Sequence, residues 1–313
     1  MSPPDPESYW CLTGVTATGK SAIAVALAQR LDAEVLSLDS MAVYRGMNIG
    51  TATPTPEQQA AVPHHLINLI APDEEFSVAQ WLELAQAKID EVRGRGKLPL
   101  FVGGTPLYLK CLLRGLFEGP QADWELRQEI QAELEAHGAE ALHARLEQVD
   151  PVAASAIHRN DTRRILRALE VYRATGEPIS HQQMEFEDAR PAEECRVFVL
   201  QRDRPTQHRR IEQRVDAMID GGLVEETQAL VADGNGLGRT ARQAVGYQEV
   251  LDYLAGEHDL ARAAERTKAR TRRFAKRQGT WFRSLSECRF VELTDDGTAE
   301  AIADRVAKAG GAG

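Results

Sequence analysis

The sequence has few cysteines and no long apolar run. Its four cysteines (Cys11, Cys111, Cys195 and Cys288) lie far apart and form no C-x-x-C pair. Neither a zinc site nor a disulfide framework is therefore indicated, and we expect buried thiols. No apolar run approaches the roughly 18 residues that a membrane-spanning helix needs. Met1–Ser8 lacks the basic and apolar regions of a secretory signal, so we expect a cytoplasmic protein that contacts no membrane.

Positive charge is scarce overall but concentrated in one segment. The 313 residues are 43% hydrophobic and 27% charged, with a formal net charge of −10. This balance is typical of a globular protein with a core, and such an acidic protein is ordinarily a poor partner for nucleic acid. From Arg262 to Arg283, however, nine lysines and arginines occur with one acid, Glu265. The segment predicts a basic helix on an acidic protein.

Residues 14–21 read GVTATGKS and match G-x-x-x-x-G-K-[ST] at every fixed position. Tyr9–Thr13 predicts a strand before this motif and Ser21–Leu31 a helix after it, which is the context of a phosphate-binding loop. Backbone N–H groups in such a loop converge on a di- or triphosphate. The Lys20 side chain can reach the outer phosphate, and the Ser21 hydroxyl can ligate Mg²⁺. The expected phosphate-binding residues are Gly14, Val15, Thr16, Ala17, Thr18, Gly19, Lys20 and Ser21.

Apolar segments alternate with helical patterns over most of the chain, which predicts an α/β fold with a parallel sheet. We expect further strands at residues 33–38, 64–70, 98–102, 195–200 and 290–293, and helices that include residues 76–93 and 298–308. The strand at 64–70 begins with His64 and His65. Adjacent side chains of a strand point to opposite faces, so capping or hydrogen bonding suits these histidines better than one shared metal.

Polar residues follow two of these strands. Asp39 comes directly after the strand at 33–38, and Gly103-Gly104-Thr105 follows the strand at 98–102. Strand ends line the ligand crevice of an open α/β sheet, so Asp39 is either a functional acid or a turn residue. A P-loop ATPase normally carries an acid at such a strand end to help hold Mg²⁺. Gly-Gly-Thr instead suits a site that grips a phosphate without positioning a hydrolytic water.

The α/β alternation stops between about residues 121 and 190. Helical patterns at 123–137, 139–148 and 161–175 predict a helical insertion domain over 122–191, with the core at 1–121 and 192–313. The last of these helices carries Arg163, Arg164 and Arg167 on one face. That face is either an interaction surface or a solvated one.

The basic helix ends KRQGTWFR, residues 276–283. Basic side chains interleaved with aromatic ones suit RNA, because bases stack on rings while lysine and arginine bind phosphates. Trp281 is either such a ring or a core residue. More arginines precede this helix, on the approach to and within a helix that reaches Ile219: Arg202, Arg204, Arg209, Arg210 and Arg214.

Seven motifs taken in order resemble the bacterial tRNA dimethylallyltransferases. They are GVTATGKS, DSMAVYRGMNIGTA, HHL, GGTPLYL, NDTRRILRALEVYRATGEPIS, AVGYQE and TRRFAKRQGTWFR, and they span about residues 10–285. Two positions depart from the family pattern. Ala42 stands where members usually carry glutamine, and Pro106 stands where they often carry glycine or another residue.

The resemblance implies a P-loop NTPase-like core and a defined reaction. A dimethylallyl group would pass from dimethylallyl diphosphate to the exocyclic N6 amine of the adenine 3′ of the anticodon, in tRNAs that read codons beginning with U. Asp39 resembles the family's general base, which removes a proton from this poorly nucleophilic amine. Lys20, Thr105, Arg214 and Mg²⁺ near Ser21 would stabilise the leaving diphosphate, with Arg209 and Arg210 as alternatives to Arg214.

The resemblance also implies a tRNA partner, held at its anticodon stem-loop by the insertion, the loop at 243–248 and the basic helix of a monomeric enzyme. The implied tRNA-binding residues are Asp39, Ser40, Met41, Ala42, Thr105, Arg127, Arg163, Arg164, Arg167, Gln243, Gly246, Tyr247, Lys276, Arg277, Gln278, Trp281 and Arg283.

Three other functions fit parts of the sequence. A P-loop small-molecule kinase explains the loop and the acid at a strand end, but it leaves the basic helix without a role. A non-catalytic RNA-binding protein with a nucleotide-responsive switch explains the helix but not Asp39 and Thr105. Isopentenyl transfer to free adenine nucleotides is chemically closest, and the basic helix favours a macromolecular acceptor over it.

Overall fold

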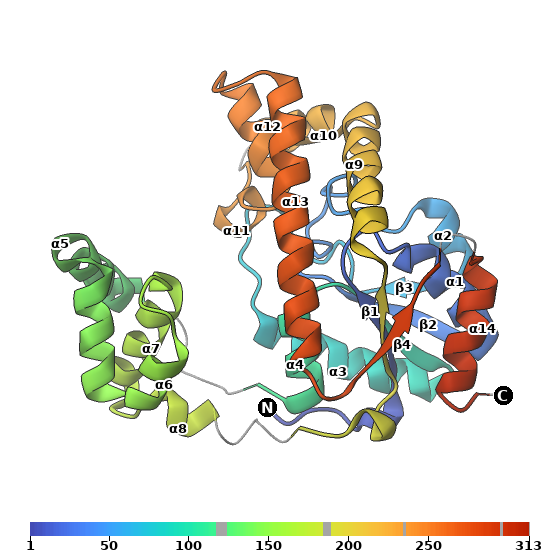
Figure 1. Cartoon of the computed structure of the whole chain (residues 1–313), viewed down its shortest axis with the longest axis horizontal. Helices are drawn as coiled ribbons and strands as arrows, with labels where there is room; N and C mark the ends of the chain where they lie inside the picture. Colours follow the sequence, from blue (N-terminus) through green and yellow to red (C-terminus); the bar gives the residue numbers. More distant parts are fainter. Residues whose placement is uncertain (117–123, 184–188, 234–235, 295–296, 313) are drawn as a thin grey trace. The chain divides into compact units, whose positions relative to one another are not determined.

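The computed structural model describes residues 1–116, 124–183, 189–233, 236–294 and 297–312. The chain divides into two compact units (Figure 1). Unit 1 comprises Met1–Pro3 and Arg114–Asp188, and unit 2 comprises Pro4–Leu113 and Ala189–Gly313. Unit 1 therefore begins before the predicted insertion boundary at 122.

Unit 2 is built on a six-stranded parallel sheet in the order β3-β2-β4-β1-β5-β6. The predicted parallel α/β core is confirmed. Strands β1 and β2 are buried along their whole length, which explains why they are continuous apolar runs in the sequence. The strands are β1 Trp10–Gly14, β2 Ala33–Leu38, β3 His64–His65, β4 Leu98–Gly103, β5 Val197–Gln201 and β6 Cys288–Glu292.

Helices cover this sheet, and the long helices α9 and α13 run side by side (Figure 1). A short 3₁₀ helix, η1 Pro6–Ser8, precedes β1, and another, η3 Ala192–Glu194, precedes β5. The α-helices that follow the strands are α1 Lys20–Leu31, α2 Pro56–Ala61, α3 Val78–Gly94, α4 Pro106–Arg114, α9 Arg204–Asp220, α10 Leu223–Ala232, α11 Arg239–Arg242, α12 Tyr247–Leu254, α13 Leu260–Arg283 and α14 Ala299–Ala309.

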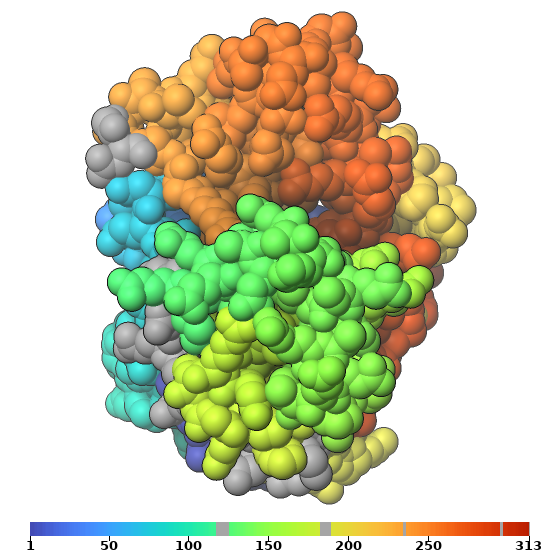
Figure 2. Space-filling model, turned by 90° about the vertical axis from the view of Figure 1, so that its left-hand side faces the viewer, coloured from blue at the N-terminus to red at the C-terminus, as the bar shows by residue number. Residues whose placement is uncertain are grey.

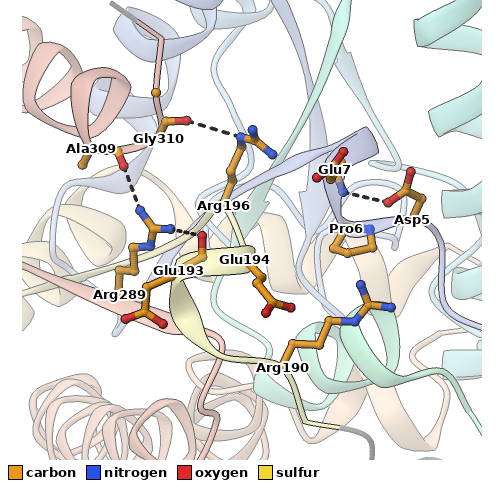
Figure 3. A pocket seen from close by; sticks show the side chains of 11 residues that line it. Asp5, Pro6, Glu7, Arg190, Glu193, Glu194, Arg196, Arg289, Ala309 and Gly310 are labelled. Carbon is orange, nitrogen blue, oxygen red and sulfur yellow. Dashed lines mark hydrogen bonds between the residues drawn. The ribbon is translucent and has the colours of Figure 1, made fainter.

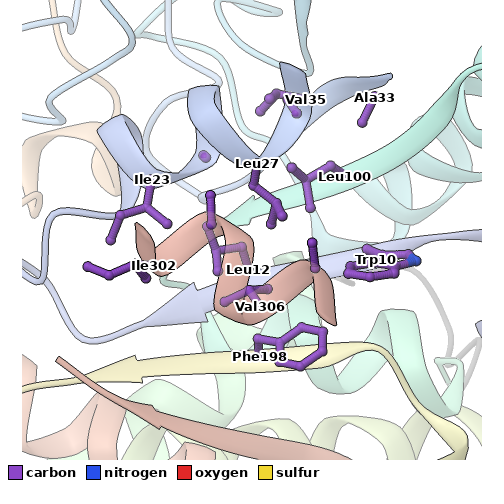
Figure 4. Packing of buried hydrophobic residues seen from close by; sticks show 14 of the residues in the cluster. Trp10, Leu12, Ile23, Leu27, Ala33, Val35, Leu100, Phe198, Ile302 and Val306 are labelled. Carbon is purple, nitrogen blue, oxygen red and sulfur yellow. The ribbon is translucent and has the colours of Figure 1, made fainter. Parts of the chain in front are cut away.

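The main hydrophobic core forms where α1 and α14 pack together on the sheet (Figure 4). Leu27 of α1 and Val306 of α14 meet Leu12, Leu100 and Phe198 of the central strands, and all five are at most 1% exposed. Burying a side chain of this size stabilises a fold by about 1.5–3 kcal/mol. This packing fixes α1 against β1 and so fixes both ends of the loop that joins them.

One predicted strand is wrong. The strand expected at 64–70 ends at His65, because Leu66 and Asn68 adopt φ values of 61° and 52°, in the left-handed region that a strand cannot contain. Asn68 N instead donates to the carbonyl of Ala42 at 2.9 Å. The two histidines form hydrogen bonds, as predicted, and His65 Nε2 lies 2.6 Å from Glu34 Oε2.

Unit 1 is helical, as the sequence predicted for this region. Its helices are α5 Trp124–Val149, α6 Pro151–Ala156, α7 Thr162–Thr175 and α8 Ile179–Gln183. Gly138 interrupts α5 with a φ of 80°, at the break between two predicted helical patterns. Ile130, Leu146 and Ile165 form part of a separate core. Figure 2 shows the surface that α5 contributes in bright green.

The cysteines are the buried thiols that the sequence predicted. All four cysteines are buried and free. Among the helices that the structure describes, none has the length and apolar character needed to cross a membrane.

Candidate active site

The loop from Gly14 to Ser21 joins β1 to α1 and has a conformation that requires its glycines. Gly14 has a φ of 147°, and a Cβ at this position would lie 2.4 Å from the carbonyl oxygen of Leu200. Gly19 has a φ of 93°, where a side chain would be strained. The loop thus reaches the N-terminus of α1 in a shape that only glycine allows at these two positions.

Side chains from α9 hold the carbonyl groups of this loop. Gln207 Nε2 donates to the Thr16 carbonyl, and Arg210 Nε donates to the Ala17 carbonyl at 2.9 Å. The N–H of a trans peptide points away from its carbonyl. Fixing these carbonyls on α9 therefore turns the N–H groups of Ala17 and Thr18 to the opposite side, where they are available to an anion.

Lys20 is hydrogen-bonded to the start of the loop and has a lowered pKa. Its Nζ donates to the carbonyls of Gly14 and Val15, at 2.9 Å each. Burial lowers the pKa of Lys20 to about 7, with a further contribution from the positive charge of Arg214, while Asp39 acts in the opposite direction. A bound anion would oppose both lowering effects. The lysine is therefore poised to gain a full charge when a phosphate binds.

Asp39 lies at the carboxyl end of β2 beside these two cations. Its Oδ1 accepts from the N–H of Met41 at 2.9 Å, so Asp39 does stabilise a turn, as one of the two predicted alternatives required. Burial raises the pKa of Asp39, whereas Met41, Lys20 and Arg214 lower it. A carboxylate that burial has made more basic can accept a proton from a substrate, so the turn does not exclude the functional role.

Thr105 connects the end of β4 to the end of β2. Its Oγ1 accepts from the N–H of Ser40 at 3.0 Å, and its own N–H donates to the carbonyl of Leu38 at 3.2 Å. A Cβ on Gly103 would lie 2.1 Å from that same carbonyl, which explains the glycine there. The hydroxyl of Thr105 is therefore held next to Asp39 and Ser40.

The predicted diphosphate-contacting arginines differ in position. Arg214 is coupled electrostatically to Lys20 and Asp39, and burial lowers its pKa. Arg210 also faces the loop, since its NH2 lies 3.4 Å from a Cβ built on Gly19. Arg209 donates to Thr206 of its own helix at 3.0 Å. The structure thus brings Arg210 and Arg214 to the loop, and the sequence alone did not separate them from Arg209.

Two predicted RNA contacts are directed inward. Tyr247 is fully buried, with its hydroxyl donating to Glu226 Oε1 at 2.6 Å and its ring against Gly50. Gln278 is 3% exposed and hydrogen-bonds the phosphate loop. The prediction that these two side chains contact RNA directly is corrected, because both are occupied by protein partners. Ala42 and Gly246 are also buried.

The basic helix α13 is neutralised between residues 266 and 272. The cations there pair with acids of α9 and α12: Arg266 with Asp252, Lys268 with Asp216, Arg270 with Glu249 and Arg272 with Glu212, at 2.8–3.0 Å. Beyond this stretch Arg273, Lys276, Arg277 and Arg283 are exposed, and none forms an ion pair with another described residue. We call these four the open cations of α13.

Unit 1 presents fewer free cations than its sequence suggested. Arg127 and Arg167 both pair with Glu170, at 2.9 Å, and this acid is 1% exposed. Their charges therefore offset a buried carboxylate. Arg163 and Arg164 are exposed, although Arg164 lies 3.5 Å from Asp161. Among the other predicted contacts, Gln243 is exposed, whereas Met41 and Trp281 are half-buried.

A hollow of about 670 Å³ lies away from this site, where β5 and β6 begin (Figure 3). Arg289 donates hydrogen bonds to the carbonyls of Ala192, Glu193 and Ala309, and Arg196 donates to the carbonyl of Gly310. Arg289 and Arg196 thus bind carbonyl groups at and just after the end of α14. Among the described residues there is also no cluster of histidine, cysteine or acidic side chains that could hold a metal by itself.

The fold and the loop define a P-loop α/β protein with a half-buried carboxylate, Asp39, near the lysine of the loop. The chain belongs to the IPP transferase family, whose model matches residues 42–285. It is 50% identical to a tRNA dimethylallyltransferase of Rhodopirellula baltica over 93% of this chain and 90% of that protein. A tRNA dimethylallyltransferase of Pelotomaculum thermopropionicum is 44% identical over 96% of both chains.

Solved structures resemble the whole chain as well. A tRNA isopentenylpyrophosphate transferase from Bacillus halodurans has a TM-score of 0.68 and 39% identity, covering 97% of this chain and 96% of that one. A eukaryotic dimethylallyltransferase acting on tRNA has a TM-score of 0.79 and 27% identity, covering 96% of this chain and 77% of that one. The resemblance drawn from the motifs is confirmed.

Proposed function

We propose that this protein is a tRNA dimethylallyltransferase that moves a dimethylallyl group from dimethylallyl diphosphate to the N6 amine of the adenine 3′ of the anticodon. The observation that carries this proposal is the placement of Asp39, which lies at a strand end beside Lys20 and Arg214. A base and a diphosphate cradle thus share one site, as alkyl transfer to a weak nucleophile requires. The names and coverage of the relatives support the same reaction.

In this reaction the bond from the allylic carbon to the diphosphate oxygen breaks while the bond to N6 forms. The amine nitrogen becomes acidic as it is alkylated, and Asp39 takes its proton. Negative charge grows on the departing diphosphate, which the loop N–H groups, Lys20 and Arg214 stabilise. Thr105, held beside Asp39 through Ser40, would donate its hydroxyl to the diphosphate or position the base.

The residues of the loop fit a Mg²⁺ ion. Mg²⁺ prefers oxygen ligands and is usually held by one or two protein groups plus phosphate oxygens and waters. The Ser21 hydroxyl at the start of α1 is exposed and is of the right type. Ser21 would hold the ion, which would supply neutralising charge for the diphosphate.

The open cations of α13 are the proposed contact for the tRNA backbone, together with Arg163 and Arg164 of unit 1. Exposed lysines and arginines without acidic partners bind phosphates because they release counterions. Such a surface has no use in a small-molecule kinase or in an enzyme for free nucleotides. It therefore favours an anticodon stem-loop as acceptor.

Nucleoside analysis tests the proposal directly. Purified protein, dimethylallyl diphosphate, Mg²⁺ and unmodified tRNA are incubated and the tRNA is digested. Isopentenyladenosine should appear with tRNA and not with AMP as acceptor. Product from AMP alone, or consumption of ATP with a hydroxylated metabolite in its place, would refute the proposal.

A further inference from the structure

Gln278 stands out among the residues around the loop because it lies in the predicted RNA-binding stretch of α13 but points into the protein. Its Oε1 accepts from the N–H of Thr16 at 2.9 Å, and its Nε2 donates to the carbonyl of Gly104 at 2.6 Å. Both ends of the amide are therefore satisfied by backbone groups of the active site. The reaction described above leaves this arrangement without a purpose.

The first consequence concerns the donors of the loop. In a phosphate loop the backbone N–H groups are the main ligands of the anion. The N–H of Thr16 is already bonded to Gln278, so it is not free for phosphate. The loop is left with the N–H groups that follow Thr16, and these lie closer to the start of α1.

The second consequence concerns space at the outer end of the anion. The lysine of this motif reaches the outermost phosphates, so Lys20 Nζ marks that end. A Cβ built on Gly104 would lie 2.7 Å from Gln278 Nε2 and 3.8 Å from Lys20 Nζ. The Gln278 amide and the Lys20 ammonium are therefore neighbours against Gly104. A phosphate chain that extended past Lys20 towards Gly104 would therefore meet the Gln278 amide.

The position of Gln278 is firmly held. Gly279, the next residue of α13, approaches Val15 of the loop, with 3.6 Å from a built Cβ to Val15 Cγ1. Ala275 of α13 packs with Ala17 and Ile211 in a small buried cluster. To move Gln278 aside, a ligand would have to break two hydrogen bonds and leave a buried carbonyl at Gly104 unpaired.

We propose that Gln278 is a specificity-determining residue that ends the phosphate site after two phosphates and so excludes nucleoside triphosphates. This inference rests on the proposed function, because it assumes that the loop binds the diphosphate of the prenyl donor. It adds a reason why a loop of the type used by ATPases would accept a prenyl diphosphate while ATP is abundant. Gln278 thus distinguishes ligands by the length of the phosphate chain.

Calorimetric titration with inorganic diphosphate and inorganic triphosphate, both with Mg²⁺, tests this proposal. The parent should bind diphosphate more tightly than triphosphate. Gln278→Ala frees the Thr16 N–H and the space beside Lys20, and we expect the ratio of the two affinities to fall by about tenfold or more. Gln278→Met keeps most of the volume but loses both hydrogen bonds, so its ratio should lie between those of the parent and the alanine variant.

Thr280→Ala is the matched control, because Thr280 is exposed on the same helix and donates to Lys276 of that helix; its ratio should equal that of the parent. If both Gln278 variants lose affinity for the two anions equally, Gln278 is only structural and the proposal fails. If the parent binds diphosphate and makes isopentenyladenosine but the ratio does not change, only this inference fails. If the parent binds no diphosphate, the proposed function fails with it.

Discussion

Replacing Asp39 by asparagine separates the two roles that the structure gives this side chain. Asparagine keeps an oxygen that can accept from the N–H of Met41, the 2.9 Å bond that shapes the turn after β2. It removes the negative charge and the ability to take a proton. The turn and the neighbouring Ser40–Thr105 bond should survive, and only the chemistry should be lost.

The expected loss follows from general base catalysis, which is worth about 10²–10⁴-fold in rate. The affinity for diphosphate, in contrast to the rate, should not fall. Asp39 is the negative charge facing Lys20 and Arg214, so its removal leaves the site more positive. We expect kcat to fall by about 10²–10⁴, while the affinity for diphosphate stays the same or rises.

Single-turnover formation of isopentenyladenosine, with saturating tRNA and prenyl diphosphate, measures the first quantity, and calorimetric titration with inorganic diphosphate measures the second. The pH dependence provides a further check. The base acts only when deprotonated, so the parent's rate is lost as pH falls through the raised pKa of Asp39, and this acidic limb should be absent from Asp39→Asn. A variant rate within about a factor of three of the parent, well short of the expected range, would refute the assignment.

Three other substitutions test the rest of the site. Lys20→Met should abolish diphosphate binding. Because the pKa of Lys20 in the folded protein is lowered to about 7, the stability of the parent relative to this variant should increase as pH rises from 7 towards 10. Equal pH profiles of the two proteins in urea melts would contradict the lowered pKa of Lys20. Thr105→Ala should slow single turnover at saturating donor by about tenfold or more, with Thr105→Ser as the control that retains the hydroxyl; a normal rate would make Thr105 only structural. Replacing Lys276 and Arg277 together by alanine should weaken tRNA binding and flatten its salt dependence by about one unit per lost phosphate contact, without affecting diphosphate binding. Unchanged filter-binding titrations would exclude this face of α13 as a tRNA contact. Arg266→Ala is a matched control because Arg266 is paired with Asp252.

The sequence predicted what depends on local pattern. The strands of the core, the loop at 14–21 and the acid after β2 all follow from apolar runs and motif spacing, and the structure places them together. The strand predicted at 64–70 was wrong because the left-handed conformations of Leu66 and Asn68 leave no mark in an apolar pattern.

The parts that could not be predicted depend on contacts between distant residues. Gln278 bonds Thr16, and Gln207 bonds the same residue from α9, but both appear in the sequence as ordinary polar helix positions. The ion pairs of α13 between residues 266 and 272 were equally hidden, since their acidic partners lie on α9 and α12. The number of charges along one helix cannot show which of its cations form ion pairs with other helices.

The supports of the phosphate loop also constrain the order in which the protein matures. The loop precedes its supports along the chain: its carbonyls are held by α9 and its Thr16 N–H by Gln278, more than 250 residues later. β5, which flanks the loop's own strand, also follows the whole of the helical insertion. A nascent or prematurely terminated chain that lacks α13 therefore carries the complete motif but an unsupported loop. We therefore expect incomplete products neither to bind prenyl diphosphate nor to modify RNA.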